Sequence, residues 1–334
     1  MQLEITEQTP LLAKNGQLSA KGYATKMNFV YNRENAKRFP LKLKEWNFYQ
    51  IQKDHYVLQL TLGHVSYMCS VAATLIDLDT GKKYEFGTMK PFFIPELDRN
   101  PEQKSLVTFE DKNYSLSFQV TPEKRILHVQ GSNKTYHNVE IHIALDNDAE
   151  NAKMVIATPF EKPTQFYLNY KENYYHGTGT VQFDKLKIDF DGCTGLIDWG
   201  RGIWPYSHQW FWGNLTSHIE GIPFGFNIGW GFGDLSHATE NMFFYDKKAY
   251  KLGVLQVERD ETDYMKPWKL SDPDHLLQMT FTPLFDNYTQ NKYVVIDTHC
   301  NQIFGFFDGV IETDQGPKEF RNTLAFIEHA VNHW

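Results

Sequence analysis

One carboxylate, Asp198, lies inside an aromatic and glycine-rich stretch whose residue types are the best suited in this chain to do chemistry. Residues 192–233 contain five of the eight tryptophans, and Asp198 stands between Ile197 and Trp199. Apolar neighbours remove water from a carboxyl group, which raises its pKa and keeps it protonated near neutral pH. A protonated carboxyl group among aromatic rings can act as a general acid.

Arg201 follows Asp198 by three residues and supports a second interpretation. A guanidinium group beside the carboxylate would lower its pKa, and the two side chains could form a buried structural ion pair. Gly200 and Gly202 indicate backbone crowding or positive φ here, which both interpretations accommodate. Arg201 could also meet an anionic group of a substrate. The sequence leaves these alternatives open.

An aromatic series follows at a spacing of two residues. In an extended strand such residues share one face. The members are Trp204, Tyr206, His208, Trp210 and Trp212. We interpret the series as a wall for an apolar ligand, with ring faces that would stabilise a positive intermediate. The alternative is core packing between two sheets. His208 is the candidate for a second acid–base group, and its alternative is a hydrogen-bonded core histidine.

The next segment, residues 222–233, also alternates. Trp230 falls on its bulky face, whereas Asn227 shares the other face with glycines, so a ligand or a neighbouring strand should lie across Asn227. A three-residue turn would pair Trp212 with Phe226 and merge the bulky faces of the two strands, and we expect this arrangement.

Glu240 is the second candidate carboxylate of this region. Together with Asp198 it could supply the paired carboxylates of a glycosidase. Nothing in the sequence sets the distance between the two groups.

Several function classes are disfavoured. Motifs such as HExxH, CxxC, the EF-hand loop and GxSxG are absent from the sequence, so we expect no metal and no cofactor. A net charge of −8 without a basic block argues against nucleic acid and against an anionic membrane surface. No apolar run is long enough for a membrane span, and no signal peptide is visible. Three widely spaced cysteines fit a reducing compartment, so we expect a cytoplasmic protein.

The elements that must position these residues are strands. Of the 334 residues, 15% are aromatic, and aromatic residues favour strands. Alternating segments separated by turns, such as the one at Asp79–Gly81, predict an all-β protein of antiparallel barrels or sandwiches. We expect few short helices, one near Asn32–Arg38 and one at the C-terminus. The strands are too many for one small barrel. We therefore expect two closely packed β domains, residues 1–190 and 191–334.

Distinctive blocks occur along essentially the whole chain. They include YNRENAKRFPLKLKEWNFY, MVIATPF, LIDWGRGIWPY, FGFNIGWGFGD, ATENMFFYD, IFGFFDG and the terminal NHW. In these blocks the chain resembles a bacterial family, domain-of-unknown-function family 2804. The family has no established activity, so the resemblance brings no catalytic residues with it. The family is remotely similar to two-domain lipocalin-like proteins, which include carotenoid hydratases, tocopherol cyclases and lipid carriers. The resemblance thus implies two lipocalin-like (calycin-type) units.

Three hypotheses about function follow. In the first, the aromatic wall holds an apolar or amphipathic small molecule, and Asp198 catalyses its hydration, isomerisation or cyclisation as an acid without a cofactor. In the second, the same cavity belongs to a non-catalytic carrier. In the third, the protein is a carbohydrate-active enzyme. The expected partner is a small molecule in each case, and a homodimer is left open.

Overall fold

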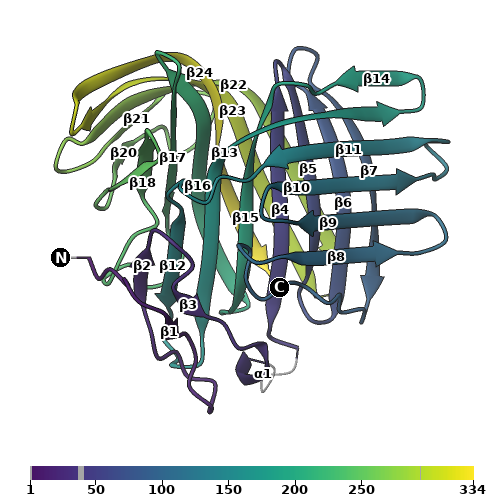
Figure 1. Cartoon of the computed structure of the whole chain (residues 1–334), viewed down its shortest axis with the longest axis horizontal. Coiled ribbons are helices and arrows are strands. Elements are labelled where there is room, and N and C mark those ends of the chain that lie inside the picture. The colour runs from purple at the N-terminus through teal and green to yellow at the C-terminus, as the bar shows by residue number, and fades with distance from the viewer. Residues whose placement is uncertain (1, 37–40, 294) are drawn as a thin grey trace.

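Antiparallel strands make up almost all of the chain in the computed structural model, which describes residues 2–36, 41–293 and 295–334. They form two large curled sheets that lie side by side (Figure 1). One sheet has thirteen strands, β2 and β4 to β15, and the other has nine, β16 to β24. The predicted all-β fold is therefore confirmed.

The first sheet follows the order β7-β6-β5-β4-β15-β13-β11-β10-β9-β8, with β12 paired to β13 and β2, and β14 paired to β13. Its strands are β2 (Gly22–Ala24), β4 (Lys44–Lys53), β5 (Tyr56–His64), β6 (Met68–Asp77), β7 (Lys82–Pro91), β8 (Ser105–Glu110), β9 (Tyr114–Val120), β10 (Lys124–Gly131), β11 (Val139–Asp146), β12 (Met154–Pro159), β13 (Phe166–Phe183), β14 (Leu186–Asp189) and β15 (Cys193–Ile203).

The second sheet follows the order β19-β18-β17-β16-β24-β23-β22-β21-β20. Its strands are β16 (Ser207–Ile219), β17 (Ile222–Trp230), β18 (Met242–Tyr245), β19 (Lys248–Lys251), β20 (Gln256–Glu258), β21 (Trp268–Ser271), β22 (Leu277–Tyr293), β23 (Ile296–Thr313) and β24 (Gly316–His333).

The N-terminal segment holds the remaining elements, the parallel pair β1 (Thr9–Pro10) and β3 (Phe29–Val30) and the short helix α1 (Arg33–Ala36). The helix lies within the range where the sequence predicts one, and the predicted residues 37 and 38 are outside the described residues. The helix predicted at the C-terminus is wrong, because that segment is paired with β23 and β16 as β24. Figure 1 shows this segment below the two sheets.

The chain changes from the first sheet to the second at residues 204–206, between β15 and β16. Residues 193–203, which we expect in the C-terminal domain, are thus hydrogen-bonded into the first sheet as β15. The domain boundary at residue 190 stays a prediction.

Each sheet curls around its own apolar core. Tyr49, Leu60 and Trp199 belong to the core of the first sheet, and Phe226 and Phe307 belong to that of the second. The opposite faces of the two sheets meet through a third cluster. Its buried members are Val57, Ile76, Leu78, Leu196, Trp212, Phe304 and Phe326. Full burial of such side chains contributes about 1.5–3 kcal/mol each, so this contact holds the two sheets together.

The hairpin between β16 and β17 corrects one expectation. Its turn has two residues, Glu220 and Gly221, both with positive φ, and Ile219 pairs with Ile222. Trp212 therefore pairs with Gly229 instead of Phe226, and the predicted merging of the bulky faces is wrong. A tight turn with φ > 0 at both central positions fixes this register.

The new register separates the two aromatic faces. Phe226 and Ile228 point into the core of the second sheet, whereas Trp212 shares the outward face with the glycines of β17. The tryptophans of β16 are thereby directed toward the first sheet.

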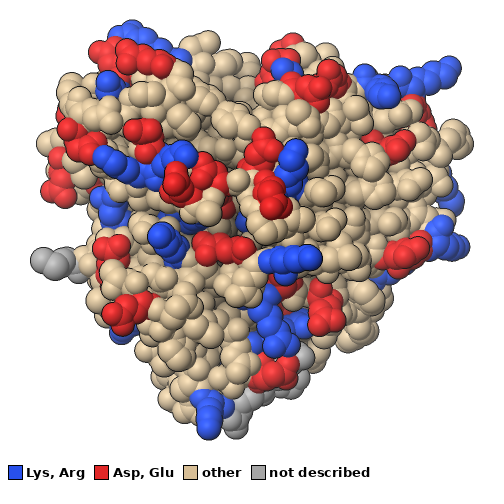
Figure 2. Space-filling model, in the orientation of Figure 1, with Lys and Arg blue, Asp and Glu red and all other residues tan. Residues whose placement is uncertain are grey.

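Charged side chains are mixed over the surface. Figure 2 shows Lys and Arg interspersed with Asp and Glu on the face in view, with uncharged surface between them. This face carries no concentrated basic area of the kind that binds a phosphate backbone. Among the described helices, none is long and apolar enough to cross a membrane.

Candidate functional site

A cavity of about 480 Å³ lies between the two sheets, on the faces that point away from each sheet's own core. Trp46 and Phe48 of β4, Asp198 of β15, and Trp210 and Trp212 of β16 line it. Their neighbours in sequence, such as Tyr49 and Trp199, point into the core of the first sheet. The volume falls within the range typical of small-molecule sites.

One wall of the cavity is aromatic and comes from both sheets. Trp46 stacks on Tyr167 with ring centroids 5.8 Å apart, and Phe48 contacts Trp212 edge to face at 6.2 Å. Phe232 also lines this wall. Indole and phenyl rings supply apolar area and negative ring faces.

Two glycines explain the position of Trp46. Gly63 of β5 and Gly200 of β15 are its cross-strand partners on either side. A Cβ atom on Gly200 would overlap the indole ring of Trp46, and one on Gly63 would press on the Cβ of Trp46. Close approach of an aromatic ring, the crowding expected from the sequence, therefore requires glycine at position 200.

Asp198 is buried and faces the cavity. Its Oδ2 accepts a hydrogen bond from Trp46 Nε1 at 3.2 Å, and its Oδ1 accepts one from Asn169 Nδ2 at 2.5 Å. Burial raises the pKa of Asp198, and the nearby charge of Lys171 and the two hydrogen bonds oppose that rise without cancelling it. A carboxyl group with this environment can hold a proton and deliver it to a bound molecule.

Glu328 of β24 is a second carboxyl group in the cavity. It accepts a hydrogen bond from Trp210 Nε1 at 2.7 Å. Burial, with the charge of Asp198, raises its pKa to about 7, although the hydrogen bonds from Trp210 and Cys300 and the charge of Lys171 act in the other direction. Glu328 is thus close to half protonated at neutral pH.

Lys171 and Glu240 form an ion pair in the same cavity, with Nζ 2.7 Å from Oε2. The ammonium group also lies 4.4 Å from the centre of the Trp212 ring. Asn227 donates to Glu240 Oε2 at 3.1 Å and accepts from Trp212 Nε1 at 2.8 Å, so it positions both groups. The side chain that lies across the glycine face of β17 is Glu240, above Gly229.

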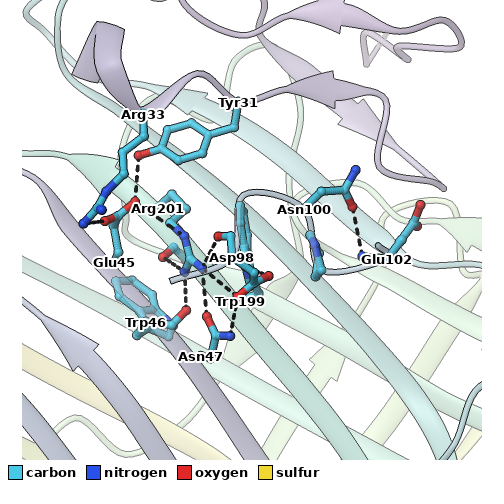
Figure 3. Close-up of polar contacts among 12 residues, drawn as sticks. Tyr31, Arg33, Glu45, Trp46, Asn47, Asp98, Asn100, Glu102, Trp199 and Arg201 are labelled. Carbon is cyan, nitrogen blue, oxygen red and sulfur yellow. Dashed lines mark hydrogen bonds and ion pairs between the residues drawn. The ribbon is translucent and has the colours of Figure 1, made fainter. Parts of the chain in front are cut away.

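Asp198 and Arg201 do not pair, because they lie on opposite faces of β15. Arg201 points into the first sheet, where it meets Asp98 at 3.3 Å and Glu45 at 3.6 Å. It also donates to Trp46 O and to Asn47 Oδ1 (Figure 3). The interpretation of Asp198–Arg201 as an ion pair is therefore wrong. Side chains three residues apart in a strand diverge.

Arg201 belongs instead to a buried charge network under the N-terminal segment. Glu45 binds Arg33 of α1 at 2.6 Å and His64 at 2.9 Å, and it accepts from Tyr31 Oη at 2.9 Å. Figure 3 shows Arg201 between Glu45 and Asp98, with Trp199 beside it. Trp199 donates to Asp98 Oδ2 at 2.8 Å, and its ring lies 3.8 Å from the Arg201 guanidinium. Trp199 and Arg201 thus lie behind the cavity wall.

The remaining predicted residues lie outside the cavity lining. Trp204 Nε1 donates to His208 Nε2 at 3.2 Å, and His208 Nδ1 lies 2.9 Å from Pro205 O. Burial lowers the pKa of His208 to about 4, so the ring is neutral with both nitrogens occupied. Tyr206 is exposed, and Trp230 stacks on Phe211 beside the core of the second sheet.

Sequence reasoning missed several residues of the site, among them Trp46, Lys171 and Glu328. A signal exists for Glu328, because it interrupts an apolar face of residues 324, 326 and 330. Lys171 is similarly the charged residue among alternate uncharged residues of β13, positions 167, 169 and 173. A charged residue on such a face needs a partner or a function.

Potential metal ligands gather elsewhere. Within the described ranges, the group that could hold an ion is His55, Asp77 and Asp79, at the ends of the β4–β5 and β6–β7 hairpins. None of these three residues lines the cavity.

The two curled antiparallel sheets match two lipocalin-like units in their fold. Residues 2–334 match the family model described as a domain of unknown function, DUF2804, so the chain belongs to that family. No curated protein matches the sequence.

Two solved structures are similar to this chain. Kievitone hydratase from Nectria haematococca superposes with a TM-score of 0.51 at 13% identity, over 92% of this chain and 95% of that chain. A proposed AttH protein from Nitrosomonas europaea gives a TM-score of 0.48 at 9% identity, over 86% of this chain and 92% of that chain. At 13% identity, the likeness to kievitone hydratase shows the fold alone.

Proposed function

We propose that this protein binds an apolar or amphipathic small molecule in the cavity between its sheets and converts it by acid catalysis without a cofactor. The reaction is a hydration, an isomerisation or a cyclisation, and Asp198 donates the proton. The observation that carries this proposal is a buried carboxyl group with a raised pKa beside the indole of Trp46.

The chemistry begins with transfer of the Asp198 proton to a carbon–carbon double bond of the ligand. The π electron pair forms the new C–H bond and leaves a positive carbon, which the ring faces of Trp46, Trp210 and Trp212 stabilise. Attack of water on that carbon followed by proton loss gives a hydrated product. Proton loss from a neighbouring carbon gives an isomer. Attack by an internal double bond or hydroxyl group closes a ring, and proton loss from the resulting cation gives the neutral cyclic product.

Glu328 supports the return of the proton. Because its pKa is about 7, it can accept the proton that the attacking water or the substrate releases, and it can give that proton back to Asp198. Two carboxyl groups with separated tasks are a common arrangement in acid–base catalysis.

Another part of the cavity lining suits the polar end of an amphipathic ligand. Gln59, Asn287, Thr289 and Gln302 line it, and Gln59 and Asn287 both donate to Gln302 Oε1, at 2.7 and 3.1 Å. The lining as a whole is mostly apolar, and Lys171 engages Glu240. These features support an apolar or amphipathic ligand over the sugar of a glycosidase.

The test compares wild type with Asp198→Asn by mass spectrometry of cell extract incubated with each protein, and it separates retained from consumed compounds. We expect a compound that wild type converts to a hydrate or an isomer, and that Asp198→Asn retains unchanged. Asp54→Asn, in the exposed β4–β5 turn, is the matched control and should behave as wild type.

Two outcomes contradict the proposal. Retention without conversion by both proteins would make this protein a carrier. Conversion by Asp198→Asn at the wild-type rate would remove Asp198 from the reaction. Circular dichroism of each variant establishes that it is folded.

A further inference from the structure

The cavity carries more acidic groups than basic ones. Asp198, Glu240 and Glu328 lie in its lining, and among the described residues of that lining Lys171 is the one lysine or arginine. The three carboxyl groups influence one another, since the charge of Glu240 raises the pKa of Asp198 and the charge of Asp198 raises that of Glu328.

Glu45 and His64 also reach the cavity lining, but their charges are compensated elsewhere. The Glu45 carboxylate lies 2.6 Å from Arg33, 2.9 Å from His64 and 3.6 Å from Arg201. These partners hold the pKa of Glu45 at about 2. This network therefore offers neither an unpaired anion nor an available cation to a ligand.

Lys171 is not available to an anionic ligand either. Its ammonium group is bound to Glu240 at 2.7 Å and lies over the Trp212 ring at 4.4 Å. A carboxylate that approached Lys171 would displace the carboxylate of Glu240. It would also lie in the same cavity as Glu328, which is mostly ionised above its pKa of about 7. Repulsion between like charges is strong in a poorly hydrated site.

A positively charged ligand would be attracted by the same cavity. The contact of Lys171 with Trp212 shows that a ring of this wall holds a cation, and the indoles of Trp46 and Trp210 offer further ring faces. Aromatic rings together with carboxylates are the usual surroundings of bound organic ammonium groups.

We propose that the cavity selects its ligand by charge, accepting uncharged and cationic amphiphiles and excluding anionic ones such as fatty acids. The inference rests on the proposed function of this cavity and narrows its substrate class. The substrate is an uncharged amphiphile that becomes positive during the reaction, and stable cations of the same shape are its inhibitors.

The test uses three ligands with the same alkyl chain, dodecanol, dodecyltrimethylammonium and dodecanoate. Each ligand is titrated against the folded full-length protein with the uncharged dye N-phenyl-1-naphthylamine bound, and displacement of the dye is measured. The titration is done at about pH 8, where a carboxylic acid is ionised. We expect dodecanol and dodecyltrimethylammonium to displace the dye, and dodecanoate to require at least about tenfold more ligand, which corresponds to about 1.4 kcal/mol.

A matched pair of variants assigns the selection to the cavity. Glu328→Gln keeps the acceptor for Trp210 Nε1 and removes one negative charge, so dodecanoate should bind several-fold more tightly to it. Glu312→Gln, an exposed position on β23, should leave all three ligands unchanged.

The outcomes separate the two proposals. Equal displacement by dodecanol and dodecanoate would overturn selection by charge, while the proposed binding function would stand. Failure of all three ligands and of the dye to bind would overturn both. If Asp198→Asn still binds dodecanol more tightly than dodecanoate but no longer converts the substrate, the result would support both proposals.

Discussion

Replacement of Arg201 by glutamine tests whether the buried charge network around Arg201 stabilises the fold without taking part in the proposed reaction. Arg201 is fully buried and donates to Trp46 O, Gly200 O, Asn47 Oδ1, and Asp98 O and Oδ1. A glutamine side chain is shorter and uncharged, and it cannot reach these acceptors together. Asp98 and Glu45 would then lose a buried positive partner.

The expected cost is large for one substitution. Breaking a buried ion pair by removing one partner destabilises a protein by about 3–5 kcal/mol. Total stabilities are about 5–15 kcal/mol. We therefore expect Arg201→Gln to unfold at a much lower urea concentration than wild type, while the folded fraction keeps its ligand binding, because Arg201 lies behind the cavity wall.

The assay is urea unfolding followed by tryptophan fluorescence, with Arg321→Gln as the control. Arg321 is exposed and pairs with Glu319 on the surface, so its removal should leave the midpoint where it is. Equal midpoints for wild type and Arg201→Gln would refute the structural role of Arg201. Loss of ligand binding in a protein of unchanged stability would place Arg201 in the site after all.

Three further predictions concern the cavity and its surroundings. Because the pKa of Glu328 is raised to about 7, the folded state binds more protons than the unfolded state between about pH 4.5 and 7, so stability falls as pH rises through this window. Glu328→Gln should flatten this fall, seen as thermal midpoints across pH, and an identical slope in both proteins would contradict the raised pKa. Gly200→Ala should displace the Trp46 indole, cost about 1–3 kcal/mol in urea unfolding and weaken dye binding, whereas wild-type affinity would show that the indole position is unimportant. His208→Phe should cost about 1 kcal/mol by leaving Trp204 Nε1 without its acceptor and should leave the conversion rate of the folded protein unchanged; a rate loss would make His208 catalytic.

Local patterns predicted the strands well, because alternation and turn residues act over a few neighbouring positions. The turn at Asp79–Gly81 lies between β6 and β7 as expected. The register of the β16–β17 hairpin was missed because it depends on positive φ at Glu220, which is an uncommon conformation for glutamate.

The composition of the site was only partly predictable, since its walls come from strands distant in sequence. Asp198 is recognisable from its neighbours, but its hydrogen-bond donor Trp46 precedes it by 152 residues. Glu328 meets Trp210 across 118 residues. Such pairs follow from the order of strands in the two sheets, which alternation along one chain does not encode.

The location of the cavity has a thermodynamic consequence. Because each sheet fills its own interior, the binding space exists only while the two sheets are docked, and a ligand that touches both walls is a joint component of that docking. Binding of the proposed ligand and docking of the two sheets would therefore be thermodynamically linked. A bound molecule adds its own binding free energy to the contact around Phe304 and Phe326, and any force that separates the halves also releases the ligand.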